Sequence, residues 1–132
     1  MSGTLTNTNK VFDLRSVAQH QYRASNAFEH HNFIFRDVGK RLCDRLNDIN
    51  RKFHTALELG ARGDILPTAL LQSGAKKRCE IKQFLRFGPD GDAHSEFEAL
   101  PIAENSLDLV LSNLTLHWLN DLPGTLLQLR KA

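Results

Sequence analysis

The segment 107–112, Leu-Asp-Leu-Val-Leu-Ser, constrains the fold of this chain more than any other stretch of its sequence. It is almost continuously apolar, whereas a strand with one face in water would alternate apolar and polar residues. A run of this kind is typical of a strand in a parallel sheet that carries helices on both faces. We therefore expect a strand over 107–112 inside a layered α/β structure.

Helical and strand patterns alternate along the rest of the chain. Apolar residues recur every three or four positions from about Glu29 to Asn47, which predicts an amphipathic helix. Its apolar stripe comprises Phe33, Ile34, Val38, Leu42, Leu46 and Ile49. The other predicted segments are a strand at 55–59, a helix at 65–72, one or two short strands at 78–87, a loop at 88–95 and a helix at 121–131. This order predicts a Rossmann-like α/β fold with a mostly parallel sheet and flanking helices.

The length of 132 residues suits a single domain. We expect residues 1–25 to form a polar tail and a weak helix ahead of a domain at 26–132. The net charge of +2 is too small to indicate nucleic acid as a partner, and no apolar run reaches the length of a membrane span. Because the first residues lack a secretory signal, we expect a cytoplasmic protein, or a mitochondrial matrix protein in a eukaryote.

The chain contains two cysteines, Cys43 and Cys79, and neither belongs to a Cys-x-x-Cys pair. No spacing of cysteine and histidine residues resembles a zinc site, so we expect reduced thiols and no metal. The histidine pair His30-His31 is read as surface, because no further ligand follows at helical spacing.

The turn Glu58-Leu59-Gly60-Ala61-Arg62-Gly63 follows the first predicted strand. In open α/β sheets ligands bind at the carboxyl ends of the strands, where glycines let the backbone approach closely and a helix N-terminus offers N–H groups. The same pattern also arises as an ordinary strand-to-helix turn. It lacks the Gly-x-Gly-x-x-Gly of dinucleotide-binding proteins and the Gly-Lys-Ser/Thr of a P-loop.

Two later segments resemble class I S-adenosylmethionine-dependent methyltransferases. Residues 96–112 (EFEALPIAENSLDLVLS) match an acid followed by a Leu-Pro turn and a Ser-x-Asp-Leu-Val strand. Residues 112–123 (SNLTLHWLNDLP) are similar to the branch that holds the malonyl-carrier-protein methyltransferase of biotin synthesis and a mitochondrial complex I assembly factor. The resemblance extends over most of the chain.

The resemblance implies S-adenosylmethionine as cofactor and assigns roles to particular residues. Glu58, Gly60, Ala61 and Gly63 would hold the methionine end. Glu96 and Phe97 would hold the adenine, and an acid at the end of the second strand, near Glu80, would hold the ribose hydroxyls. Asn113 and His117 would face the transfer site and are the candidate catalytic residues, with Asn113 also a candidate cofactor ligand. The alternative for the pair His117-Trp118 is structural: Trp118 packs on the sheet and His117 bonds nearby backbone.

The chain departs from the family pattern at several points. Arg62 stands where the family has a second glycine, so it either blocks the methionine end or points to solvent. A second strand, a helix and a third strand are expected between the first cofactor turn and Glu96, although that stretch is short. The chain ends at Ala132, after the helix that follows the fourth strand of the family. We therefore expect a fragment, a truncated product or a sheet edge covered by a partner, for example in a homodimer.

The leading hypothesis is a methyltransferase whose acceptor is a small acyl carrier substrate or a protein side chain. The alternative is a catalytically inactive, methyltransferase-like scaffold or assembly factor. A third hypothesis is a nucleotide-binding Rossmann domain of another class.

Overall fold

The computed structural model describes residues 10–93 and 97–132, so residues 1–9 of the predicted polar tail lie outside the described residues. Within these residues helices and strands alternate as predicted. The elements in chain order are α1 (Leu14–Ala24), η1 (Ser25–Ala27), α2 (Phe28–His31), α3 (Phe33–Leu46), β1 (Thr55–Leu59), α4 (Ile65–Gln72), α5 (Ala75–Arg78), β2 (Gln83–Phe87), β3 (Leu109–Ser112), η2 (Leu116–Trp118) and α6 (Leu122–Lys131).

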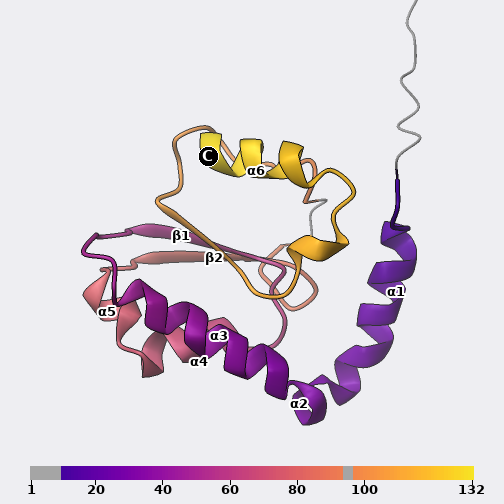
Figure 1. The fold of residues 1–132 in the computed structure, drawn as a ribbon, viewed down its shortest axis with the longest axis horizontal. Coiled ribbons are helices and arrows are strands. Elements are labelled where there is room, and N and C mark those ends of the chain that lie inside the picture. The colour runs from indigo at the N-terminus through magenta and orange to yellow at the C-terminus, as the bar shows by residue number, and fades with distance from the viewer. Residues whose placement is uncertain (1–9, 94–96) are drawn as a thin grey trace, which may run out of the picture.

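The three strands form one parallel sheet in the order β2-β1-β3. The first strand, β1, is therefore central, and four of its five residues are buried. Helices α3, α4 and α5 lie on one face of the sheet and α6 lies on the other, while α1 stands beside these layers (Figure 1). The prediction of an α/β fold with a parallel sheet and flanking helices is confirmed.

The hydrophobic core lies between the sheet and the pair α3 and α4. It comprises Cys43, Leu46, Phe53, Ala56, Leu66, Ala69, Leu70, Ala75, Cys79, Ile81 and Leu111. Both cysteines are free and buried within it. Burial raises the pKa of the Cys43 thiol to about 11, because a thiolate would be poorly solvated there.

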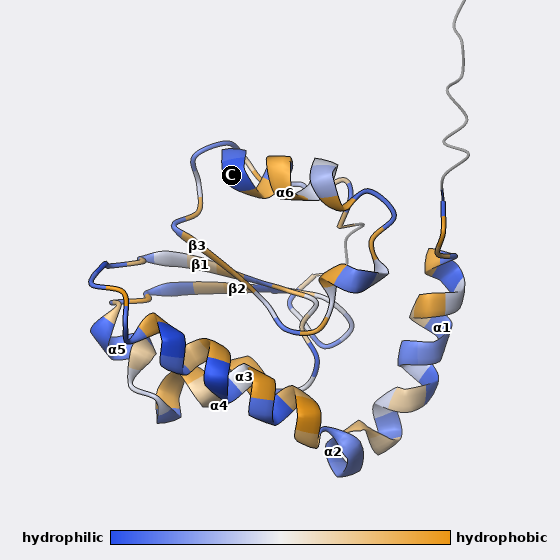
Figure 2. Cartoon of the chain, viewed as in Figure 1, coloured by the Kyte–Doolittle hydropathy of each residue, from blue (hydrophilic) through white to orange (hydrophobic). Residues whose placement is uncertain are grey.

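The predicted helix at 29–47 exists, but its buried stripe differs from the expected one. The helix is divided at Asn32, and the side chains of Phe33 and Ile34 are 72% and 53% exposed. The buried positions are Gly39, Cys43 and Leu46, which recur at helical spacing. Hydrophilic and hydrophobic residues alternate along α3 accordingly (Figure 2). Gly39 faces α4 because a Cβ there would lie 2.9 Å from Cγ2 of Ile65.

Among the described residues between α4 and β3, 73–93 and 97–108, there is a single strand, β2, instead of the expected second strand, helix and third strand. The expectation of two strands there is therefore wrong. Gly74 (φ 75°) ends the α4 segment, the short α5 follows, and the chain enters β2 at once. No helix among residues 10–93 and 97–132 is long and apolar enough to cross a membrane.

Candidate functional site

The site lies at the carboxyl ends of the three strands, where β1 turns toward α4. Glu58 occupies the next-to-last position of β1 and is 2% exposed. Gly60 follows with φ 87°, a conformation that glycine adopts without strain. A Cβ at Gly60 would lie 2.1 Å from Oγ1 of Thr115, so this position requires glycine for space as well. The strand-to-helix turn therefore packs directly against the segment after β3.

The loop after β2 packs equally closely on the turn after β1. The carbonyl oxygen of Phe87 accepts hydrogen bonds from the N–H groups of Gly60 (2.7 Å) and Ala61 (2.9 Å). Gly88 has φ 152°, and a Cβ there would lie 2.3 Å from the backbone nitrogen of Ala61. The backbone donors of Gly60 and Ala61 are thus already bonded within the chain.

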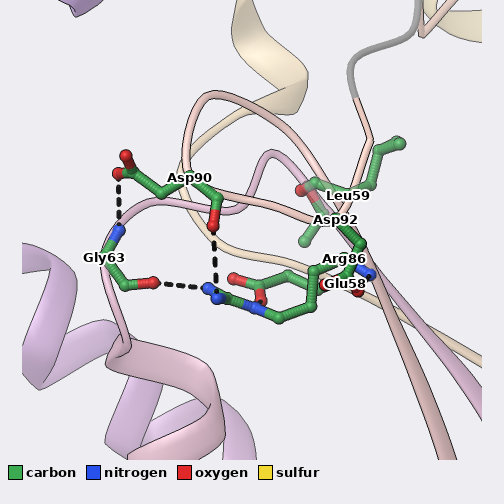
Figure 3. A network of polar contacts seen from close by, with 7 residues as sticks. Glu58, Leu59, Gly63, Arg86, Asp90 and Asp92 are labelled. Carbon is green, nitrogen blue, oxygen red and sulfur yellow. Dashed lines mark hydrogen bonds and ion pairs between the residues drawn. The ribbon is translucent and has the colours of Figure 1, made fainter.

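Charged side chains join the two loops (Figure 3). Nε of Arg86 lies 2.6 Å from Oε2 of Glu58, in an ion pair whose side chains are 16% and 3% exposed. The N–H of Gly63 donates to Oδ2 of Asp90 at 2.7 Å. Burial raises the pKa of the Glu58 carboxyl, and the hydrogen bond and charge of Arg86 partly oppose that effect.

Arg62 does not point freely to solvent, so that expectation for it is corrected. Its guanidinium lies 4.5 Å from the ring centroid of Phe28 and 5.8 Å from that of Phe35. The two rings pack edge to face, with centroids 5.1 Å apart. Burial against this pair lowers the pKa of Arg62, while the charge of Asp90 raises it. The arginine is held by cation–π contacts on the α2–α3 side of the turn.

The segment after β3 places Asn113 beside α3. Asn113 is 5% exposed, and its Nδ2 donates to the carbonyl oxygen of Phe35 at 2.9 Å. Its Oδ1 is buried and has no hydrogen-bond partner among residues 10–93 and 97–132. Thr115 follows, and its hydroxyl donates to the carbonyl oxygen of Asn113 at 3.1 Å. An unpartnered buried acceptor costs free energy, so Asn113 is a point where a donor would be bound favourably.

Trp118 packs on the N-terminal segment, a contact that the structural alternative for this residue did not include. Its ring meets that of Phe12 edge to face, with centroids 5.6 Å apart, and lies 4.8 Å from the ring of His117. His117 itself is exposed. The backbone of Phe12 is fixed on the same side, because Asn120 accepts from its N–H at 2.7 Å and donates to its carbonyl oxygen at 2.9 Å.

A cavity of about 330 Å³ lies between α1 and these loops. One wall comes from α1, with Leu14, Arg15, Val17, Ala18 and Gln21. The other walls come from Gly88 and Pro89 after β2, from Phe97, and from Thr115, Trp118 and Leu119 after β3. Because Gly88 contacts Ala61 and Thr115 contacts Gly60, the cavity adjoins the turn after β1. Its volume falls at the lower end of the roughly 300–1,000 Å³ typical of small-molecule sites.

The fold brings most of the predicted site residues to this edge of the sheet. Glu58 lies near the end of β1, while Gly60, Ala61 and Gly63 share the turn that follows it. Asn113 follows β3, and Phe97 lines the cavity. Glu96 lies outside the described residues.

Glu80 lies elsewhere, and its expected place after the second strand is wrong. It precedes β2, has φ 54°, and pairs with Nζ of Lys52 at 3.2 Å. This position belongs to the amino end of the sheet. The acids that follow β2 are Asp90 and Asp92, and the latter accepts from the backbone N–H of Arg86 at 3.0 Å.

Three residues of the site were missed in the sequence: Arg86, Asp90 and Asp92. A strand-like QFLRF followed by a turn with two acids carried the signal for them. The mixed polarity of that strand and the turn chemistry of GPDGD concealed it, because both are typical of surface loops.

Comparison with known proteins bears on this site. The chain is 33% identical over 111 residues to "Arginine-hydroxylase NDUFAF5, mitochondrial" of Mus musculus, covering 74% of the chain and 31% of that protein. The Danio rerio protein of the same name is 31% identical over 132 residues (92% of the chain, 41% of the relative). "Malonyl-[acyl-carrier protein] O-methyltransferase" of Gallionella capsiferriformans is 27% identical over 140 residues (92% and 48%).

The chain therefore spans 31%, 41% and 48% of the lengths of these three relatives. No solved structure is significantly similar to it. The methyltransferase-domain family matches residues 63–132, which include the loop after β2, β3 and α6. Since this match covers more than half of the chain, the protein belongs to the methyltransferase-domain family.

Proposed function

We propose that this chain is the cofactor-binding part of an S-adenosylmethionine-dependent methyltransferase. The main support is that three features lie together in this member of the methyltransferase-domain family. The acid Glu58, the turn with Gly60 and Gly63, and an apolar cavity all meet at the carboxyl edge of a parallel sheet. Ligands of open α/β proteins bind at this edge.

The cavity fits the adenine of S-adenosylmethionine, whereas the polar turn does not fit its methionine end. The side chains of Phe97, Pro89 and Trp118 give the cavity apolar walls that suit a purine ring. The polar groups do not fit the methionine end in this conformation, because the Glu58 carboxylate is paired with Arg86. The N–H groups of Gly60, Ala61 and Gly63 are also bonded within the chain. A ligand with charged groups would have to replace these contacts.

The proposed roles of the residues also differ between the apolar cavity and the polar groups. In this proposal Phe97, together with Glu96, contacts the adenine, and Asp92 replaces Glu80 as the acid nearest the ribose. Asn113 is the remaining polar candidate, since its buried Oδ1 lacks a donor among the described residues. His117 is exposed next to Trp118, which lines the cavity, and is the candidate base for an acceptor that carries a proton.

The acceptor is proposed to be a small acyl carrier substrate or a protein side chain. Both classes appear among the relatives, one named for malonyl-acyl-carrier protein and the other for arginine. In a eukaryote we propose the mitochondrial matrix as the location, in line with the names of the NDUFAF5 proteins, and the cytoplasm in a bacterium. A second copy pairing along β3, an edge strand of the sheet, is a proposed partner, and light scattering of the purified chain would test it.

Thermal unfolding with added ligand tests the function. S-adenosylmethionine should raise the melting temperature progressively once its concentration exceeds the dissociation constant, whereas NADH should not. The variant Phe97→Ala should lose most of this shift, because it removes an aromatic wall of the cavity. The variant Phe33→Ala is the control, since that side chain is 72% exposed on α3. A shift with NADH alone would instead favour a nucleotide-binding protein of another class.

The second candidate function is a catalytically inactive scaffold or assembly factor. The observation that favours it is the bonding of Glu58 and of the turn's N–H groups within the chain. A folded protein that shows no thermal shift with millimolar S-adenosylmethionine would support this candidate and contradict the methyltransferase.

A further inference from the structure

Arg86 and Glu58 are direct neighbours across the sheet. The strands β1 and β2 pair in parallel with Glu58 opposite Arg86, so the two side chains project from the same face. Their ion pair is nearly shielded from water, with exposed fractions of 16% and 3%. A pair in such surroundings is screened by salt much less than a surface pair.

The remaining nitrogens of Arg86 extend the contact to both loops. Nη2 donates to the carbonyl oxygen of Gly63, and Nη1 donates to that of Asp90 at 3.4 Å. The Asp90 carboxylate in turn accepts the N–H of Gly63 at 2.7 Å. Arg86 thus ties β1, the turn before α4 and the loop after β2 together (Figure 3).

Arg86 and Asp90 place a cation beside a carboxylate, as the ammonium and carboxylate of an amino acid do. Arg86 presents a cation to Glu58, and Asp90 presents a carboxylate to the N–H of Gly63. The methionine end of S-adenosylmethionine likewise carries an ammonium beside a carboxylate. The two side chains therefore satisfy the groups that an amino-acid end would otherwise bind.

We propose that Arg86 and Asp90 form an internal latch that occupies the amino-acid part of the cofactor site and lowers the affinity for ligands with an amino-acid end. The inference rests on the proposed function, because it concerns the same site. A ligand ammonium that displaces Arg86 exchanges one cation for another at Glu58 and gains little. Removal of Arg86 leaves Glu58 as a buried, unpaired acid, and the ligand ammonium then stabilises its carboxylate form.

Two ligands that differ only at the amino-acid end isolate this effect. S-adenosylhomocysteine carries the amino-acid end, and 5′-methylthioadenosine has the same adenosine and thioether without it. Calorimetric titration of the whole chain should give dissociation constants that agree within about threefold for the two ligands. In Arg86→Ala, S-adenosylhomocysteine should bind at least tenfold more tightly than 5′-methylthioadenosine, which corresponds to about 1.4 kcal/mol.

Two further variants identify the cause. Arg86→Ala combined with Glu58→Gln should lose most of the tenfold preference, because the carboxylate that attracts the ammonium is gone. Arg130→Ala is the matched control, since Arg130 is an exposed arginine on α6, and it should behave as the unaltered chain.

Each outcome decides between the claims. A tenfold preference for S-adenosylhomocysteine in the unaltered chain would overturn the latch and leave the proposed function standing. Equal preference in a folded Arg86→Ala variant would overturn the latch as well. Absence of binding by either ligand to every folded variant would overturn the proposed function, and the latch with it. If Arg86→Ala does not fold, the ratio in the unaltered chain decides alone.

Discussion

Gly88 lies where the loop after β2 meets the turn after β1. Its φ of 152° and the 2.3 Å that would separate an added Cβ from the nitrogen of Ala61 leave no room for a side chain. The obstacle is backbone, which cannot rotate away as a flexible side chain can. This contact fixes the distance between Glu58 and the acids that follow β2.

We expect Gly88→Ala to lower the free energy of unfolding by about 3 kcal/mol or more, because backbone strain and a steric clash add. Chemical denaturation measures the change. The control is Gly74→Ala, where φ is 75° but no atom lies within 4 Å of an added Cβ. That variant should cost only about 1–2 kcal/mol, from the left-handed conformation alone. Equal losses in the two variants would contradict the close packing of the loops.

At the scale of elements, the sequence pattern predicted the strands with buried, apolar residues closely. It predicted the partly exposed edge strand β2 less well. β1 is the central strand and β3 is mostly apolar, and the predicted bounds of both strands agree with the structure to within two residues. β2 is an edge strand whose residues are exposed or half-buried, so its QFLRF pattern predicted a short strand within 78–87 without fixing its bounds. The acid of the second strand was therefore sought at Glu80, before the strand instead of after it.

The contacts at the C-terminal end of α3 are a second feature that could not be predicted from the sequence. Arg78 of α5 donates from Nε to Oδ1 of Asn47 at 2.9 Å, from Nη1 to the carbonyl oxygen of Ile49 at 3.3 Å, and from Nη2 to that of Leu46. These carbonyls lie at and after the C-terminus of α3, where a cation is favourable. The run Lys76-Lys77-Arg78 shows only charge in the sequence, because its partners are about thirty residues away.

We expect Arg78→Ala to lower the free energy of unfolding by about 1–2 kcal/mol, through the loss of charge-assisted hydrogen bonds at a partly exposed site. Lys77→Ala, at the adjacent exposed position of α5, is the control and should change it by less than about 0.5 kcal/mol. Urea denaturation of the three proteins measures both effects. A loss in Lys77→Ala as large as that in Arg78→Ala would mean that general charge, and not the α3 contact, is responsible.

On the scale of the whole molecule, α1 is attached chiefly through its ends. None of its residues is buried, yet five of them wall the cavity. Before α1, Phe12 is held by two hydrogen bonds from Asn120 and by the ring of Trp118. The sequence predicted a weak helix in this segment but not this attachment, because the contacting residues are 108 positions apart.

We expect Asn120→Ala to release Phe12 and move the fluorescence emission of Trp118 to longer wavelength, since the indole then gains contact with water. Trp118 is the only tryptophan of the chain, so the signal is unambiguous. Asn120→Asp keeps the acceptor for the Phe12 N–H and should give a smaller shift. Ser16→Ala, on the other side of α1, should give none. An unchanged spectrum in Asn120→Ala would contradict the attachment of α1.

The central claim is that S-adenosylmethionine binds in the cavity that adjoins the turn after β1. Its most direct test is an NMR titration of the ¹⁵N-labelled chain with S-adenosylmethionine, followed at each backbone amide and at the Trp118 indole. We predict that the largest shifts arise at Gly88, Phe97 and Thr115, which line the cavity, with an accompanying shift of the indole and little change in the last two turns of α6. Shifts concentrated elsewhere, or none in a folded protein at millimolar ligand, would contradict the account.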